Sequence, residues 1–288
     1  MSVRKLVMIF YRLFTVLFVA LVFVGAFVDL PFAWWLIWVP EIIAVTLVVA
    51  LGRRTARAHV AARPPAVEVA APVTGRWSAL NSPASRVPSH RTHAYGQTYA
   101  IDIVAEPEPG SRPGFAWAWP VARRSKAFPA FGRPLLAVAD GTVVHASDSR
   151  RDHLSRNSLL ALVYLMLIEA AVRDMAGAAW ITGNHLIIDI GDGTYAMYAH
   201  VQRGSLAVRA GDRVRAGQVV GRCGNSGNST EPHVHFQLMD HPDMDVARGL
   251  PFRWHGIGVP ADGEVFTAGE EAADPGADRT AAGQAAAE

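Results

Sequence analysis

Two apolar runs at the start of the chain constrain its fold more than any other feature of the sequence. They cover residues 6–28 and 32–51 and are separated by Asp29, Leu30 and Pro31. A hydrocarbon core of ~30 Å needs roughly 20 helical residues, and each run is long enough. A signal peptide alone would not be followed at once by a second run of that length. Residues 1–52 are therefore predicted to form two transmembrane helices, a multi-pass anchor in the cell membrane.

The composition changes twice more along the chain. Residues 53–88 are rich in Ala and Pro and show no sustained period, which is typical of a linker. Residues 261–288 are mostly Ala, Gly, Glu and Asp, which predicts a disordered tail. The domain that carries the chemistry is therefore expected at residues 89–260.

Charge and cysteine content exclude several classes of protein. The formal net charge is only +2, too small to indicate a nucleic-acid partner. The single cysteine, Cys223, excludes an internal disulfide framework and a zinc site built from several thiolates.

Short apolar stretches with Gly-rich turns dominate residues 89–260. This spacing predicts a mainly β domain, a small antiparallel sandwich or barrel-like fold, with strands near 99–104, 142–146, 185–190, 195–200, 205–208 and 218–222. One helical pattern, 158–173, interrupts them within an insert at 154–176. Its apolar core of 13 residues, 159–171, is too short to span a membrane, so the helix is expected on the domain or at the membrane surface.

His233 and His235 are two residues apart in a predicted strand, so their side chains point to the same face. Such a pair suits a metal or proton-handling site, although a pair of surface histidines is the plainer interpretation of the pair alone. His93, Asp102 and His200 offer further metal or proton chemistry in the same domain. Three nitrogen or oxygen ligands with one open position are typical of catalytic zinc.

Several spaced motifs occur in an order that resembles a known family. They are ADGTV at 139–143, GNHLII at 183–188, YAMYAHV at 195–201, VRAGDRVRAGQVVGRCG at 208–224 and NSGNSTEPHVH at 225–235. Together they resemble the lysostaphin-type (LytM) zinc metallopeptidases of bacterial cell walls, over about residues 90–239. The resemblance implies a duplicated hybrid β-motif related to the biotinyl and lipoyl carriers.

The resemblance also implies the roles of individual residues. His93, Asp102 and His235 would bind one Zn²⁺ ion, and His200 and His233 would be the catalytic histidines that handle protons. The family's first histidine usually precedes the aspartate by four residues, where this chain has Thr98. The ligand must then come from further upstream, from His93 or alternatively from His90.

The function implied is a metalloendopeptidase that cuts stem or cross-link peptides of peptidoglycan with zinc-activated water. The alternative is a catalytically silent LytM-like domain that regulates a partner hydrolase. A carrier domain is disfavoured, because Lys126 is the only lysine after Lys5. The implied substrate puts the domain on the cell-wall side, whereas Arg4, Lys5, Arg53 and Arg54 around the apolar runs favour a cytoplasmic side by the positive-inside rule.

Overall fold

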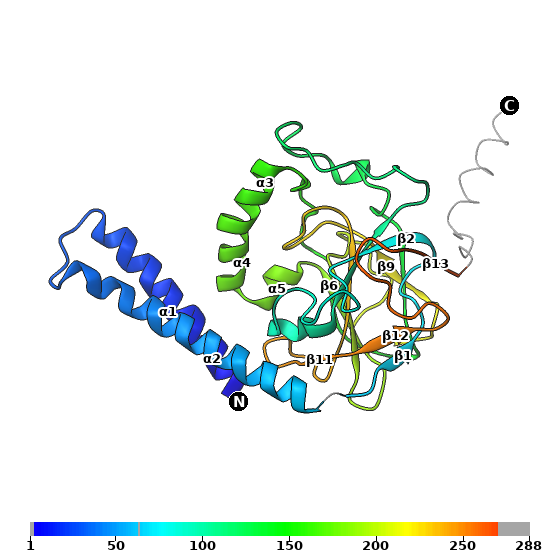
Figure 1. The fold of residues 1–288 in the computed structure, drawn as a ribbon, viewed down its shortest axis with the longest axis horizontal. Helices are drawn as coiled ribbons and strands as arrows, with labels where there is room; N and C mark the ends of the chain where they lie inside the picture. The colour runs from blue at the N-terminus through cyan, green and yellow to red at the C-terminus, as the bar shows by residue number, and fades with distance from the viewer. Residues whose placement is uncertain (1–2, 63, 270–288) are drawn as a thin grey trace.

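The computed structural model describes residues 3–62 and 64–269 and shows a helical hairpin projecting from one side of a β-domain (Figure 1). The hairpin consists of α1 (Val3–Gly25), a short 3-10 helix η1 (Trp34–Ile37) and α2 (Trp38–Ala62). Both helices are long and apolar enough to cross a membrane. Only 6% and 17% of their most apolar windows are buried, so neither is the core helix of a soluble protein.

The second helix differs from its predicted range of 32–51. It begins later, because Trp34–Ile37 form the tighter 3-10 turn, and it continues to Ala62. The first helix lies three residues earlier than the predicted 6–28. Helix ends depend on local capping and packing more than on apolar content, which is what the prediction used.

Thirteen strands make up the β part of the described chain. They are β1 (Val67–Val69), β2 (Gly75–Leu80), β3 (Ile101–Ala105), β4 (Pro134–Leu136), β5 (Gly141–Ser147), β6 (His185–Asp189), β7 (Tyr195–Ala199), β8 (Arg213–Val214), β9 (Val219–Arg222), β10 (Val234–Met239), β11 (Gly249–Leu250), β12 (Phe252–Trp254) and β13 (Val265–Ala268).

The main sheet is antiparallel, in the order β13-β2-β3-β10-β7-β6-β5-β8, with β11 paired to β10. Two small sheets pair β4 with β9 and, in parallel, β1 with β12. The mainly antiparallel β class is therefore confirmed. The order runs from β13 to β8 without closing among the described strands, so the barrel-like detail is not confirmed.

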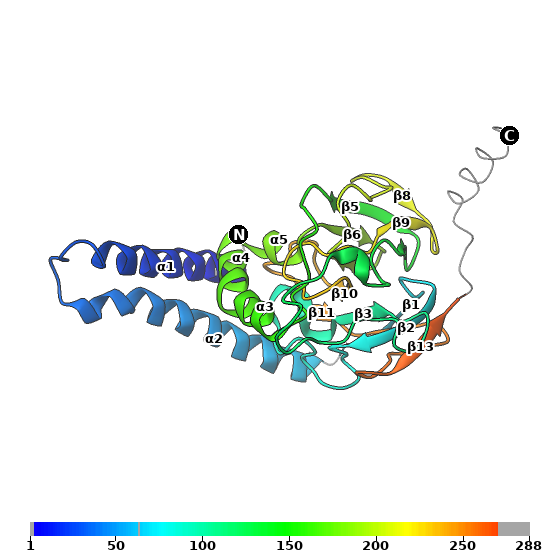
Figure 2. The same cartoon turned by 90° about the horizontal axis from the view of Figure 1, so that it is seen from above.

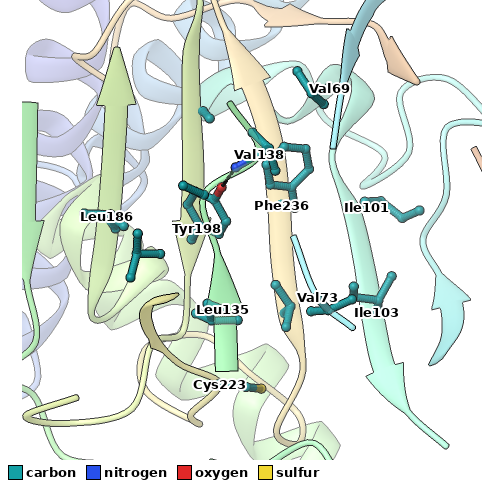
Figure 3. Close-up of a cluster of buried hydrophobic side chains, with 14 of the residues drawn as sticks. Val69, Val73, Ile101, Ile103, Leu135, Val138, Leu186, Tyr198, Cys223 and Phe236 are labelled. Atoms are coloured by element: carbon teal, nitrogen blue, oxygen red, sulfur yellow. Dashed lines mark hydrogen bonds between the residues drawn. The ribbon is translucent and has the colours of Figure 1, made fainter. Parts of the chain in front are cut away.

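Alternation along the central strands separates a core face from a functional face. Val234, Phe236 and Leu238 of β10 point into the main hydrophobic core, where Phe236 packs near Tyr198 (Figure 3). The Tyr198 hydroxyl donates to Leu136 O at 2.9 Å and accepts from Val138 N at 3.0 Å. Tyr198 therefore has a packing role, and the opposite face of these strands carries the polar residues.

Two predicted boundaries are wrong. Residues 67–69 and 75–80, expected in the linker, form β1 and β2, and Trp77 of β2 is buried in the core. Residues 265–268, expected in the disordered tail, form β13, whose Phe266 packs against Trp254 with ring centroids 5.3 Å apart. These strands are too short to show a period, and their partners lie far away in sequence. Residues 270–288 lie outside the described residues.

The predicted insert is helical. Ser158 caps α3 (Leu159–Tyr164) by accepting a hydrogen bond from Ala161 N. One π-helical turn, η4 (Leu165–Glu169), joins it to α4 (Ala170–Ala176), and α5 (Ala178–Thr182) follows. The expected strand at 205–208 is absent, and β8 lies further along instead. Two short 3-10 segments complete the domain, η2 (Ala94–Tyr99) and η3 (Ser125–Ala127).

Candidate metal centre

Three neighbouring strands, β3, β10 and β7, bring the candidate residues together. Asp102 of β3 is the register partner of His235 in β10, and His235 is also paired with Ala199 at the end of β7. His200 follows directly. Because side chains alternate along a strand, Asp102 and His235 share the face opposite the main core.

The Asp102 carboxylate is the centre of this cluster. His235 Nδ1 lies 2.8 Å from Oδ1, and His90 Nε2 lies 3.0 Å from Oδ2. The side-chain amide of Asn81 also donates to Oδ2, at 2.8 Å. One nitrogen from each histidine and one carboxylate oxygen lie within 4.8 Å of one another, so these three residues could hold a metal ion.

The expected first ligand differs from the residue that the structure brings to the cluster. His93 lies elsewhere: its Nδ1 is 3.0 Å from Thr98 Oγ1, and its ring lines a separate cavity of about 330 Å³. His90, the alternative, takes the position beside Asp102.

Local backbone bonds explain this arrangement. Ser89 donates through its amide to Thr98 O at 3.1 Å and through its hydroxyl to Gln97 O at 3.2 Å. Tyr95 and Gly96, with φ of 56° and 75°, reverse the chain between them. The loop thus folds back on itself, and His90 reaches Asp102 of β3 while His93 lies against Thr98.

Hydrogen bonds behind the histidines fix how their rings are presented. His235 Nε2 donates to Gln237 Oε1 at 2.9 Å, and Gln237 Nε2 donates to Tyr95 O at 2.8 Å. With Nε2 bonded to Gln237, Nδ1 is the ring atom of His235 that faces Asp102. Metal-binding histidines are commonly oriented in this way by an acceptor behind the ring. Sequence reasoning missed Gln237, although its position two residues after His235 on one strand face was a usable signal.

His200 and His233 present their Nε2 atoms. Nδ1 of His200 donates to Ser226 O at 2.8 Å, and Nδ1 of His233 donates to Glu231 O at 2.7 Å. The two ring centroids are 4.7 Å apart, and His200 and His235 are 5.8 Å apart. Both rings line a cavity of about 270 Å³ together with Asp102, His90 and His235. Four of the five predicted residues thus surround one cavity.

The electrostatics of the cluster follow from burial and mutual contact. Burial alone would raise the pKa of Asp102, but His90 and His233 outweigh it and hold the pKa well below its usual range. Burial lowers the pKa of His200 well below its usual value, and His233 and His235 add to this effect. For His233, burial lowers the pKa, but the charge of Asp102 prevails and the net shift is upward. The carboxylate thus stays ionised and His200 stays neutral.

The donor set fits a divalent transition metal. Two imidazole nitrogens and one carboxylate oxygen are ligands that zinc accepts, and three protein ligands leave a position open. The Nε2–H of His235 already has its acceptor in Gln237, so Nδ1 is the ring atom that would bind a metal in place of a proton.

Comparisons with known proteins find similarity to peptidases. Residues 167–246 match Peptidase family M23. A glycyl-glycine endopeptidase of Staphylococcus capitis, ALE-1, is 43% identical over 58 residues, which are 20% of this chain and 16% of the relative. The peptidoglycan DD-endopeptidase ShyA of Vibrio cholerae is 30% identical over 83 residues, 29% of this chain and 17% of the relative. Among solved structures, the catalytic domain of lysostaphin from Staphylococcus simulans aligns at 22% identity with a TM-score of 0.30, covering 52% of this chain and 74% of that one.

Residues 167–246 therefore match a peptidase M23 domain, and lysostaphin-type endopeptidases are among the relatives. The match to the family begins at residue 167, so it includes His200, His233 and His235 but neither His90 nor Asp102. The chain spans less than a fifth of the length of these two curated relatives.

Proposed function

We propose that this protein is a zinc-dependent endopeptidase that cleaves peptide bonds in peptidoglycan. The observation that carries the proposal is the convergence of His90 Nε2, Asp102 and His235 Nδ1 beside a cavity lined by two further histidines. Two curated relatives are named as endopeptidases, one glycyl-glycine and one peptidoglycan DD-specific, which supports this substrate class.

His90, Asp102 and His235 would hold the zinc ion. Bound there, zinc would supply a Lewis acid that polarises a peptide carbonyl and lowers the pKa of a water molecule. The ionised Asp102 contributes one negative charge, which offsets part of the charge of a divalent cation. Asn81, bonded to Oδ2 of Asp102, fixes the orientation of that carboxylate.

His200 and His233 would move the protons of the reaction. Each is held through Nδ1–H by a backbone carbonyl, which leaves Nε2 facing the cavity to accept a proton from water. The same atom would later donate that proton to the leaving amine. General acid–base help of this kind contributes typically 10²–10⁴-fold in rate.

We also propose that the hairpin anchors the protein in the cell membrane with the domain on the cell-wall side. Lys5 pairs with Asp243 at 2.5 Å, and Arg12 pairs with Asp245 at 2.6 Å. Part of the basic charge around the first apolar run therefore docks the helix on the domain. Arg4 also donates to Val246 O at 2.9 Å, so this second role accounts for the two basic residues before the first apolar run.

The test uses the full chain, purified in detergent with zinc and incubated with purified peptidoglycan. Mass spectrometry should find peptide fragments with new amino termini, and the Asp102→Asn variant should release none. The alternative, a silent regulatory domain, predicts no cleavage by either protein. A wild-type chain that holds zinc but cuts no peptide bond in peptidoglycan would overturn the proposal.

A further inference from the structure

In the insert helix, residues 159–176, charged side chains face the protein and apolar side chains face outward. A helix on the surface of a soluble protein has the opposite arrangement. Six apolar or aromatic side chains, which recur at helical spacings of three and four residues, lie 46–69% exposed on one side. We call them the insert face: Leu160, Val163, Tyr164, Leu167, Ile168 and Val172. A contiguous apolar surface of this kind normally marks a contact with another apolar phase.

All three charged residues of this helix are engaged with the protein. Glu169 accepts bonds from Arg156 at 2.8 Å and from Arg173 at 3.3 Å. Asp174 accepts bonds from the hydroxyls of Tyr11 and Tyr95, each at 2.5 Å. The charged side chains of the helix therefore all bond to other parts of the protein, and its apolar side faces outward.

The membrane-length hairpin adjoins this helix. Tyr11 of α1 bonds to Asp174 of α4, and the two helices are in contact. In both views the insert helix lies on the side of the domain toward which the hairpin projects, and Figure 2 shows it crossing the direction of the hairpin. A bilayer that surrounds the hairpin would therefore meet the insert face.

The depth of the bilayer is indicated by the charged residues of α1. Lys5 and Arg12 pair with the domain, and exposed apolar residues, among them Leu13, Val16 and Phe23, follow. The polar boundary thus falls near Arg12, which is also where α4 contacts α1, so the bilayer would hold the outer part of the hairpin and not the whole of α1. A helix that lies across the hairpin at this level would lie within the membrane interface.

A loop bonded to the start of α3 supplies aromatic residues of the type found at membrane surfaces. Ala116 N donates to Asn157 O at 3.2 Å, and Leu159 N donates to Ala116 O at 3.0 Å. Its neighbours Trp117 and Trp119 are 76% and 83% exposed. Tryptophan prefers the interface, where its ring meets both lipid and water.

We propose that the insert face lies in the lipid interface as a third membrane contact beside the hairpin. This inference rests on the proposed membrane anchoring. Leu165 and Met166 of the same helix line the cavity of the candidate metal centre. The centre therefore works directly at the bilayer surface, and its substrate is a peptide held close to that surface.

The test uses the full chain with Cys223, its only cysteine, replaced by alanine. Single cysteines are introduced as Leu167→Cys on the insert face, Val16→Cys in α1 and Val265→Cys in β13, which lies on the side away from the hairpin (Figure 1). Each variant carries an environment-sensitive fluorophore and is reconstituted in vesicles of phosphatidylethanolamine and phosphatidylglycerol containing spin-labelled lipid. Unchanged zinc content serves as the check that each variant is folded, and Leu160→Cys is a second insert-face position.

Lipid quenching at residues 167 and 160 should approach that at residue 16 and be severalfold stronger than at residue 265. Strong quenching at residue 16 with quenching at 167 and 160 no greater than at 265 would overturn this inference and leave the hairpin anchor standing. Cross-linking of two chains through residue 167 without lipid quenching would identify a second copy as the occupant and also overturn it. Absence of quenching at residue 16 as well would overturn the membrane anchor itself.

Discussion

His235 Nδ1 lies 2.8 Å from Asp102 Oδ1, although 133 positions separate the two residues in the chain. The pair is set by the antiparallel register of β3 and β10, in which the two residues are direct partners. A shift of one residue in this register would turn one of the two side chains into the hydrophobic core. The candidate metal centre is therefore a consequence of how these two strands align.

His90→Ala should abolish zinc binding by the full chain, because His90 Nε2 lies 3.0 Å from the Asp102 carboxylate. His93→Ala is the matched control and should keep one zinc per chain, since His93 contacts Thr98 and lines another cavity. Elemental analysis of the purified variants measures both. Zinc retained in His90→Ala and lost in His93→Ala would reverse the assignment.

Gln237→Leu should weaken zinc affinity by about 10–100-fold, because it removes the acceptor that orients the His235 ring. Competition with a fluorescent zinc chelator measures the affinity. Met239→Leu, two residues further on the same strand face, should change the affinity little. Equal affinities in the wild type and Gln237→Leu would mean that Gln237 does not support the ligand.

His200→Asn should keep its zinc and lose about 10²–10⁴-fold in kcat, because the variant has no imidazole to move protons. Asparagine is the appropriate substitute, since residue 200 has φ of 60° and asparagine tolerates that conformation. His233→Gln should behave similarly. Initial rates on a peptidoglycan peptide and zinc content are the two measurements.

Tyr198→Phe is the control for the His200 and His233 variants. The Tyr198 hydroxyl bonds to Val138 N and Leu136 O in the core, so its removal should cost about 1–3 kcal/mol of stability and leave the turnover unchanged. A His200→Asn enzyme with wild-type kcat would show that His200 has no part in proton transfer.

Stability should fall in mild acid because of His185. Burial lowers its pKa from 6.5 to about 4, and His145 stacks on it with ring centroids 4.5 Å apart. The folded state therefore favours the neutral ring, and the stabilisation present above pH 6.5 is lost as the pH falls toward 4. The loss approaches about 3 kcal/mol.

Urea unfolding of the full chain at pH 7 and pH 5 measures this effect. His185→Gln cannot titrate, so its stability should depend less on pH over this interval than that of the wild type. The same pH dependence in both proteins would assign the acid sensitivity to other groups.

The sequence predicted those features that depend on local pattern. Apolar length predicted the hairpin, and alternation with Gly-rich turns predicted the antiparallel β class. The i, i+2 spacing predicted that His233 and His235 face one volume, and the structure adds Asp102 and His200 to it.

Features that depend on distant pairing or on single backbone torsions could not be predicted. The choice between His90 and His93 follows from left-handed conformations at Tyr95 and Gly96 and from the bonds of Ser89, none of which has a sequence signature. The strands β2 and β13 are defined by pairing with each other and with β3, so composition alone assigned them to a linker and a tail.

The most direct test of a zinc peptidase is removal and return of the metal. The full chain in detergent is stripped with a chelator, and cleavage of a peptidoglycan peptide is measured before and after addition of zinc. Activity should disappear with the metal and return fully with one equivalent of zinc per chain, while stripped Asp102→Asn should stay inactive. Undiminished cleavage by the metal-free protein would show that this peptidase does not depend on zinc.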